Sequence, residues 1–266
     1  MNKRVSLACG LAVGLMMSPT ASLGGAWTLP TGDGIGIVTG TFARSDLGFD
    51  GSRSVQPIPR YNKDELQALL EYGFTDWFTA ILIPSLQHID VAQPFPGQRT
   101  GFGYTEFGGR VRLWTNDQWV ISGQTTYRVP GTYDRNNPAA IGYYDPELEI
   151  RGLVGYSYKL GSWPAFINTE VAERFRFAGP PDEFRTDITF GVRPLERWLL
   201  LAQSFNVTSE GSGTWGIPSY DYYKLQLSAV YEVTPTFSVQ LGGYTTYEGR
   251  NALQENGLIV GAWYKF

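Results

Sequence analysis

The chain has 266 residues, with 21 Lys and Arg against 25 Asp and Glu and a formal net charge of −4 at pH 7. This acidic balance argues against a nucleic-acid partner, because such proteins carry clustered positive charge. One Cys and one His in the whole chain exclude a disulfide framework and a typical zinc site, so no metal or other cofactor is expected.

The N-terminal stretch predicts an export signal. A basic start is followed by an apolar run over 5–17, which is too short to span a bilayer as a helix, and by small residues over 18–26. We expect a signal peptide over 1–25, with cleavage between 21 and 26, that removes Cys9. The candidate cleavage points are Ala21 and the run Gly24-Gly25-Ala26.

The remainder, 26–266, reads as a single domain of repeated β-hairpins. Short turns are expected at 75–76, 116–118, 161–162, 194–197 and 234–236. They alternate with longer connections rich in Gly, Pro, Asp and Asn at 45–61, 86–102, 131–144, 179–183, 209–219 and 249–255. Twelve strands lie between them: 34–44, 62–74, 77–85, 103–115, 118–130, 146–160, 163–178, 184–194, 198–208, 220–233, 236–248 and 257–266.

Several of these strands alternate apolar and polar residues with a period of two. In 163–178, Ile167 and Val171 fall on one face, and Glu170 and Arg174 fall on the other. Alternation of this kind, with short turns at one end and long loops at the other, is typical of an all-β transmembrane antiparallel up-and-down β-barrel. About twelve strands, an even number, would put both termini on the periplasmic side.

The last strand ends the chain on an aromatic residue. It resembles the terminal strand of bacterial outer-membrane barrels, where a final Phe with alternating apolar positions is the assembly signal read by the barrel-assembly machinery. We expect this strand to close the sheet against 34–44 with its apolar face toward outer-membrane lipid; a closing strand of a soluble β-sandwich is the alternative. The predicted assembly signal comprises Leu258, Val260, Ala262, Tyr264 and Phe266.

Tryptophan gathers near the predicted short turns. Indole is amphipathic and settles at the depth of lipid headgroups, so a ring of Trp at one end of a barrel marks one membrane interface. Ordinary core positions are the alternative. The predicted belt consists of Trp77, Trp114, Trp119, Trp163, Trp198 and Trp263.

The polar strand faces define a predicted lumen in which Arg outnumbers acid. Charges inside a barrel must be paired or hydrated, so two interpretations stay open: a narrow polar pore, or a salt-bridge network that fills the barrel. A symmetric hairpin around 179–183 would place Asp187 opposite Arg174 and Arg185 opposite Arg176. The inward set is Glu106, Arg110, Arg112, Arg128, Glu147, Glu149, Arg151, Glu170, Arg174, Arg176, Arg185, Asp187 and Arg193.

Candidates for chemistry are few, and we expect no enzyme. His88, the only His, lies two residues from Asp90 and could act as a base, although a solvated histidine is the simpler interpretation. The acidic pair Asp182-Glu183 could bind Ca²⁺ or the cations that accompany surface lipopolysaccharide, or could simply be solvated. No catalytic residue is assigned.

Three short motifs carry a family resemblance: Gly25-Ala26-Trp27-Thr28-Leu29-Pro30-Thr31-Gly32-Asp33-Gly34, Tyr72-Gly73-Phe74-Thr75-Asp76-Trp77 and Gly101-Phe102-Gly103-Tyr104-Thr105-Glu106-Phe107-Gly108. The chain resembles the outer-membrane family of proposed transporters of the meta-pathway of phenol degradation, whose turn motif usually has a polar residue in place of Trp77. The resemblance implies an outer-membrane barrel without agreed catalytic residues.

These observations together predict a protein of the Gram-negative outer membrane that is in contact with lipid and lipopolysaccharide. Its expected function is passive passage of small solutes, with aromatic compounds as the candidate class. The alternatives are an outer-membrane lipid-modifying enzyme and a structural or surface-interaction barrel with a filled lumen.

Overall fold

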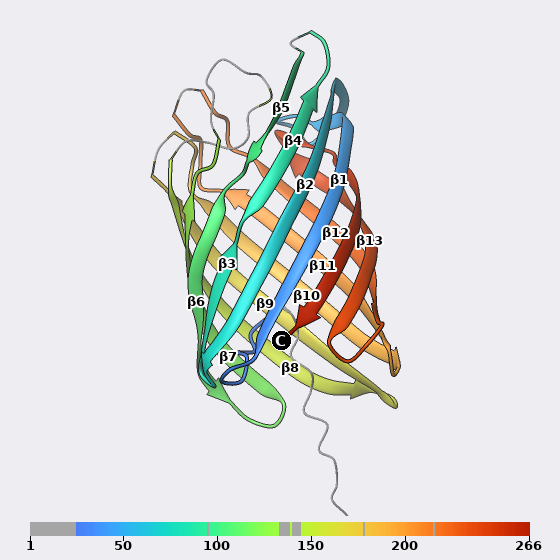
Figure 1. Cartoon of the computed structure of the whole chain (residues 1–266). Helices are drawn as coiled ribbons and strands as arrows, with labels where there is room; N and C mark the ends of the chain where they lie inside the picture. Colours follow the sequence, from blue (N-terminus) through green and yellow to red (C-terminus); the bar gives the residue numbers. More distant parts are fainter. Residues whose placement is uncertain (1–24, 95, 133–138, 140–144, 178, 215) are drawn as a thin grey trace, which may run out of the picture.

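The computed structural model describes residues 25–94, 96–132, 139, 145–177, 179–214 and 216–266. Within these residues, fifteen strands form one antiparallel sheet, which closes into a barrel because β1 pairs with both β2 and β15 (Figure 1). The strands are β1 (Gly34–Phe49), β2 (Val55–Thr75), β3 (Phe78–Ile83), β4 (Ser85–Val91), β5 (Gly97–Phe102), β6 (Thr105–Thr115), β7 (Trp119–Val129), β8 (Glu147–Leu160), β9 (Trp163–Arg176), β10 (Glu183–Leu195), β11 (Trp198–Ser209), β12 (Asp221–Glu232), β13 (Phe237–Arg250), β14 (Ala252–Leu253) and β15 (Asn256–Lys265).

Twelve of these strands form the wall, as the sequence predicts. The other three, β4, β5 and β14, continue the sheet at one rim, where β4 pairs with β2 beyond β3 and β14 pairs with the last residues of β1. We call this rim the long-loop end and the opposite rim, with the short connections and the C-terminus, the short-turn end (Figure 1). No helix in the part of the chain that the structure describes is long and apolar enough to cross a membrane.

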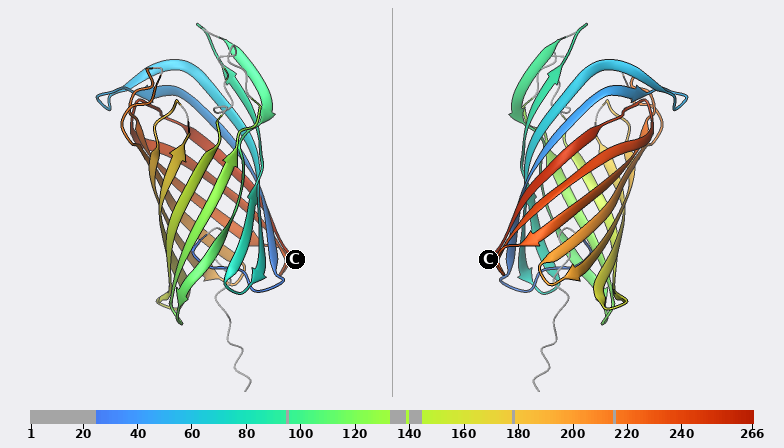
Figure 2. Two further views of the ribbon diagram at one scale, coloured as in Figure 1. Left: turned by 90° about the vertical axis from the view of Figure 1, so that its left-hand side faces the viewer. Right: turned by 90° about the vertical axis from the view of Figure 1, so that its right-hand side faces the viewer.

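Two predicted long connections are wrong. The segment 45–61 is almost all strand, with only 50–54 between β1 and β2, and 86–102 contains β4 and β5. Both hairpins extend above the wall (Figure 2). Neither face of such a hairpin is uniformly apolar, so the alternation that identifies wall strands is missing there.

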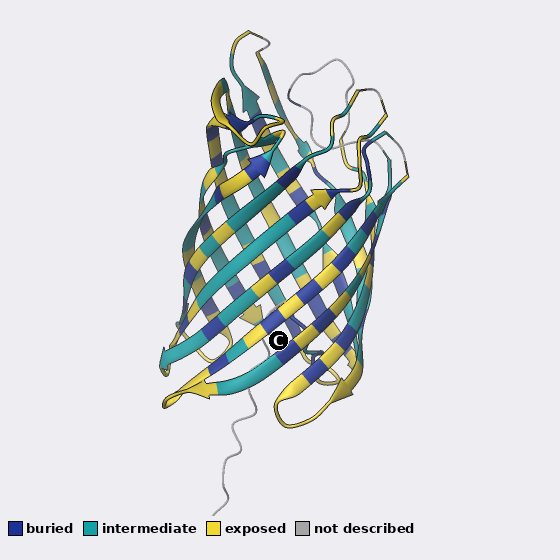
Figure 3. Ribbon diagram, turned by 180° about the vertical axis from the view of Figure 1, so that it is seen from behind, coloured by how far each residue is buried: buried dark blue, intermediate teal, exposed yellow. Residues whose placement is uncertain are grey.

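Exposure alternates along the wall strands with a period of two (Figure 3). In β9, Ile167 and Val171 are 38% and 44% exposed, whereas Asn168 and Glu170 are 2% and 8% exposed. The outer face is therefore apolar and the inner face polar, which is the reverse of a soluble β-sandwich and the pattern of a transmembrane barrel.

The last strand closes the barrel where the sequence predicts. β15 pairs with β1 from Ile35↔Lys265 to Arg44↔Asn256. The seam continues one residue further, because the backbone N–H of Gly34 donates to the carbonyl of Phe266 at 2.7 Å and the backbone N–H of Phe266 donates to the carbonyl of Gly34 at 3.0 Å. Four of the five predicted assembly-signal side chains are exposed on the outer face, and Ala262, in the same phase, is half-buried.

Five of the six predicted belt tryptophans lie on the outer face at the short-turn end. Trp77, Trp114, Trp119, Trp163 and Trp198 are all exposed there, each within a few residues of a short connection. Their placement at a membrane interface stays a prediction. The expectation for Trp263 is wrong, because this side chain is 6% exposed and points into the barrel. Its neighbours Ala262 and Tyr264 take the outward phase, so the intervening residue must face inward.

The barrel lumen as candidate functional site

All thirteen predicted lumen residues occupy inward-facing positions, and most of them form a network with further side chains, whereas Arg193 pairs apart from it with Glu232. Twelve of them take part in an ion pair with another inward side chain. Arg112 lies nearer the short-turn end, where its charge acts on Asp76. The network divides into an upper layer toward the long-loop end and a middle layer.

The upper layer contains four guanidinium groups and four carboxylates. Arg174 contacts Glu149 at 2.6 Å and Glu183 at 3.7 Å, and Arg185 contacts Glu183 at 3.2 Å. Each carboxylate in this layer therefore meets at least one cation, which offsets the cost of removing these charges from water. The members are Arg128, Arg174, Arg176, Arg185, Glu106, Glu147, Glu149 and Glu183.

The middle layer contains two arginines. Arg110 contacts Glu71 at 2.7 Å, and their side chains are 2% and 3% exposed. Arg151 lies against three carboxylates: Glu149 at 2.8 Å from the upper layer, Asp187 at 2.6 Å, and Glu170.

The predicted excess of arginine over acid is wrong. The sequence interpretation missed five inward carboxylates: Glu65, Glu71, Glu183, Glu232 and Glu255. Two inward lysines were also missed: Lys63, which contacts Glu65 at 2.9 Å, and Lys224, which pairs with Glu255. A signal was present for the β2 residues, because Glu65 and Glu71 alternate with the apolar positions of that strand. Glu183 and Glu232 lie at predicted strand ends, where phase is difficult to assign.

The predicted hairpin register between β9 and β10 is also wrong, although Arg174, Arg176, Arg185 and Asp187 do share the inner face. In the structure Glu183 lies opposite Arg174, and Asp187 lies opposite Glu170. The strand β10 begins directly after Asp182, whose Oδ1 accepts the backbone N–H of Arg176 at 2.6 Å. The first pair of this register therefore brings unlike charges together, Glu183 and Arg174. The symmetric register would instead have placed Arg185 opposite Arg176, which is unfavourable.

Residues 25–33 enter the lumen from the short-turn end and are held there by hydrogen bonds. The backbone N–H of Ala26 donates to Oδ1 of Asn168 at 2.8 Å, and its carbonyl accepts the Ser122 hydroxyl. Arg110 donates to the carbonyl of Trp27 at 3.0 Å. Such bonds contribute about 1 kcal/mol each. This segment, which we call the N-terminal segment, is therefore an ordered part of the lumen.

Two glycines make room for the N-terminal segment. A Cβ on Gly73 would lie 2.1 Å from the carbonyl oxygen of Pro30, and a Cβ on Gly155 would lie 2.5 Å from the ring of Trp27. The Trp27 ring also meets Phe166 edge-on, with ring centroids 5.8 Å apart. The sequence interpretation placed Trp27 before the first strand at the same end of the barrel and did not foresee its entry into the lumen.

Below the charged layers, the short-turn end of the lumen is apolar. Leu29 of the N-terminal segment packs against inward side chains of β1, β11, β12 and β15. Trp263 belongs to this cluster, and its ring N–H donates to Gln240 at 3.1 Å. The buried members are Leu29, Ile35, Ile37, Leu199, Val230 and Trp263. The N-terminal segment and this cluster occupy much of the lumen at the short-turn end, and Ile37, Leu199 and Trp263 also border the cavity described next.

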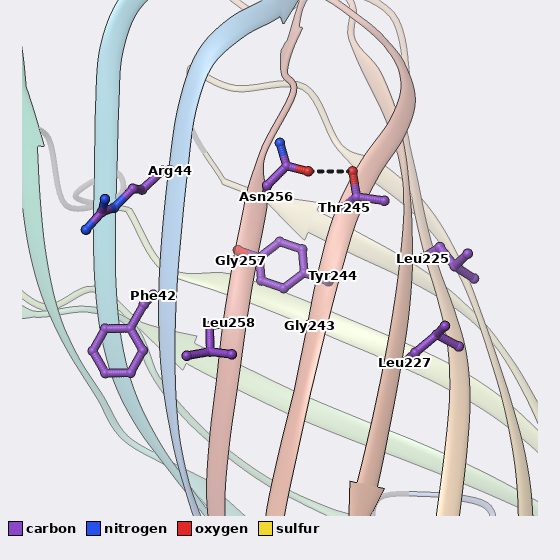
Figure 4. A pocket seen from close by; sticks show the side chains of 10 residues that line it. All are labelled: Phe42, Arg44, Leu225, Leu227, Gly243, Tyr244, Thr245, Asn256, Gly257 and Leu258. Carbon is purple, nitrogen blue, oxygen red and sulfur yellow. Dashed lines mark hydrogen bonds between the residues drawn. The ribbon is translucent and has the colours of Figure 1, made fainter.

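A cavity of about 460 Å³ lies above the N-terminal segment. Its wall combines charged side chains such as Arg151 and Asp187 with amides such as Gln203 and Gln226, and Gly25 lies at its border. A second depression, of about 680 Å³, lies on the outer wall of the barrel. Figure 4 shows this depression, in which the absence of a side chain at Gly243 leaves a gap between outward-facing residues such as Leu227 and Leu258. It belongs to the lipid-facing surface and offers no path through the molecule.

The sequence candidates for chemistry, His88 and the pair Asp182-Glu183, take part in local polar contacts. Nδ1 of His88 shares a hydrogen bond of 2.7 Å with the hydroxyl of Thr100, and Asp90 instead accepts a bond from Gln98. Asp182 accepts the backbone N–H of Arg176, and Glu183 forms an ion pair with the Arg176 guanidinium. Among the described residues there is no group of three or more His, Cys, Asp or Glu side chains that could hold a metal ion.

Comparison with known proteins supports the fold. No family model and no curated protein matches the chain. A crystal structure of an outer membrane channel from Pseudomonas putida F1 is similar, with a TM-score of 0.75 at 14% identity, over 92% of this chain and 100% of that one. The NanC porin is also similar, with a TM-score of 0.56 at 10% identity, over 87% of this chain and 100% of that one. The translocator domain of the autotransporter NalP from Neisseria meningitidis has a TM-score of 0.56 at 9% identity, over 90% of each chain. The chain therefore has the fold of outer-membrane β-barrels.

Proposed function

We propose that the protein is a narrow passive channel of the Gram-negative outer membrane, with the short-turn end in the periplasm. The observation that carries the proposal is the polar cavity above the N-terminal segment, since a barrel with a purely structural interior would be filled throughout. Support also comes from the structural similarity to an outer membrane channel and to the NanC porin.

The balanced charges of the lumen set what can pass. An arginine-rich wall would select anions, whereas alternating Arg and carboxylate groups present both signs to a solute at close range. We therefore expect weak charge selectivity and a strict size limit. Aromatic acids belong in the solute panel because of the family resemblance of the three short motifs.

A structural barrel with a filled lumen is the second candidate. The dense ion pairing favours it, because it occupies the middle and upper lumen, and so does the N-terminal segment, which narrows the short-turn end. A lipid-modifying enzyme has less support, because His88, its best candidate, hydrogen-bonds to Thr100 rather than to an acidic partner.

Single-channel conductance in planar bilayers distinguishes the two candidates. We expect the wild-type barrel to give small openings. Replacing 26–31 by a Gly-Ser linker of equal length should increase the conductance several-fold, because the side chains that narrow the short-turn end are removed. Trp198→Ala, which removes an indole from the outer face at the same end, is the matched control. A folded wild-type barrel with no conductance, together with a linker variant that also has none, would establish the filled structural barrel instead.

A further inference from the structure

Outside the middle layer each inward carboxylate pairs with a cation, and the one further predicted inward cation, Arg112, lies apart near Asp76 at the short-turn end. The upper layer has four of each. Pairs outside it also match one to one: Lys63 with Glu65, Lys224 with Glu255 and Arg193 with Glu232. In the middle layer three carboxylates, Glu71, Glu170 and Asp187, face two guanidinium groups, those of Arg110 and Arg151. Among the described residues this layer is one positive charge short.

The incompletely paired carboxylates of this layer are Asp187 and Glu170, which share Arg151. Arg110 is engaged by Glu71 and by the carbonyl of Trp27, and Arg151 is shared with Glu149 of the upper layer. Asp187 is 8% exposed, yet its Oδ1 is buried and has no hydrogen-bond partner among the described residues. A buried carboxylate without full pairing is costly, because its desolvation is not repaid by contacts.

The start of the N-terminal segment lies at the same place. Asp187 and Glu170 face each other across the β9–β10 pair, and Gly25 lines the same cavity as both. The next residue, Ala26, is fully buried and donates its N–H to Asn168 at 2.8 Å. The amide of Asn168 in turn donates to Glu170 at 2.6 Å. The backbone nitrogen of Gly25 is thus one residue from a group already linked to Glu170.

We propose that the export signal is cleaved between Gly24 and Gly25 and that the new α-ammonium group of Gly25 is the cation that completes the middle layer beside Glu170 and Asp187. Cleavage by water converts the Gly24–Gly25 amide into a carboxylate, which leaves with the signal, and an amine that takes up a proton near neutral pH. The sequence around the bond fits, because Ser22 and Gly24 place small residues three and one positions before it. Export processing would then do more than release the protein, because it would also create a structural charge.

The first test needs only the wild-type protein purified from outer membranes. Intact mass and N-terminal sequencing should give a chain that starts at Gly25, and a chain with any other first residue overturns the proposal. The folded protein and the urea-unfolded protein are then acetylated at neutral pH, and the N-terminal peptide is quantified after digestion. We expect acetylation of Gly25 to be at least tenfold slower in the folded barrel. Equal rates would contradict a paired, buried ammonium.

A pair of variants separates charge pairing from simple burial. Asp187→Asn keeps the shape but removes one partner, so Gly25 should react several-fold faster and should reach half-maximal reactivity at a lower pH than in the wild type. Glu232→Gln makes the same charge change at the distant pair with Arg193 and should leave both values unchanged. The proposal fails if Asp187→Asn behaves like Glu232→Gln. None of these measurements depends on conductance, so the channel proposal stands or falls separately.

Discussion

Asp76, in the turn between β2 and β3, holds the entry of the N-terminal segment at the short-turn end. Its Oδ1 accepts the backbone N–H of Thr31 at 2.9 Å and the Thr31 hydroxyl at 2.8 Å. The pKa of Asp76 therefore lies below its usual value near 3.8, with the backbone bond as the larger cause. A carboxyl whose pKa is lowered by folding stabilises the fold above its unfolded pKa, and this contribution is lost as the pH falls through the folded pKa.

Acid should therefore loosen the N-terminal segment in a way that depends on Asp76. We expect the Thr31 amide to stay protected from hydrogen exchange at pH 5 and to lose protection well below pH 3.8, once Asp76 is protonated. Asp76→Asn keeps an acceptor oxygen without titrating, so its Thr31 protection should change little over the same range. Parallel loss of protection in both proteins would show that another group controls the release.

The buried pair Arg110–Glu71 shows how a single side chain links the wall to the N-terminal segment. Removing one partner leaves an uncompensated charge, which typically costs about 3–5 kcal/mol. We therefore expect Glu71→Gln to lower the free energy of unfolding in guanidinium by an amount of this order. The double variant Glu71→Met with Arg110→Met should recover part of the loss, because no buried charge is left unpaired. A double variant that is less stable than Glu71→Gln would show that the hydrogen bond from Arg110 to Trp27 matters more than the ion pair.

At the scale of the element, the β1–β2 hairpin connects distant parts of the long-loop end. Its turn residue Arg53, in the left-handed region with φ 69°, contacts Asp221 of β12 at 2.9 Å and Glu248 of β13 at 3.0 Å. Asp221 is 2% exposed and also meets Arg250 at 3.1 Å. The hairpin thus arches over the rim toward strands that lie beyond the seam (Figure 2).

Breaking this contact should free the hairpin without opening the wall. We expect Arg53→Ala to raise the amide exchange rates of 50–58 several-fold, while β1 below Arg44 keeps its protection because its seam bonds to β15 remain. Arg60→Ala, on the same hairpin but without a salt bridge to β12 or β13 among the described contacts, is the control. Faster exchange along the whole of β1 would mean that the arch also stabilises the seam.

The terminal strand supports a second prediction at this scale. Phe266 completes the seam with Gly34 through backbone bonds, and its exposed side chain makes a stacked contact with Tyr264, with ring centroids 6.3 Å apart. Phe266→Ala retains the backbone bonds but removes the predicted recognition group. We expect a lower yield in the outer membrane and an unchanged conductance per molecule that assembles. A changed conductance at full yield would assign Phe266 to the pore instead.

At the scale of the whole molecule, the fold could be predicted from the sequence to a large extent. The two-residue period, the short turns and the final aromatic strand are typical of a barrel wall with lipid outside. All twelve wall strands could be predicted from these three features. The alternation of apolar and polar residues does not predict the strands above the rim, such as β4 and β5, because no lipid contacts one face of the sheet there. The error at Trp263 has a different source: closeness to the C-terminus indicates the level of a residue along the barrel but not the face of the strand on which it lies.

The interior was less predictable because it depends on contacts between distant strands. The phase of each strand identified the inward arginines, but the partners of Arg151 come from β8, β9 and β10 at once. Glu71 could have been read from the alternation of β2, whereas its pairing with Arg110 depends on the closed barrel. The position of Ala26 beneath the cavity could not be predicted from the sequence, because the N-terminal segment shows no regular alternation of apolar and polar residues.

The closure of β1 on β15 also orders the events of assembly in time. The N-terminal segment is joined directly to Gly34, and Gly34 is the residue that pairs with Phe266. The N-terminal segment and the terminal strand therefore meet at a single point. If the segment threads inward while the seam is open, the step that joins Gly34 and Phe266 is also the step that traps it. Capture of the segment would then be the final event in building the molecule.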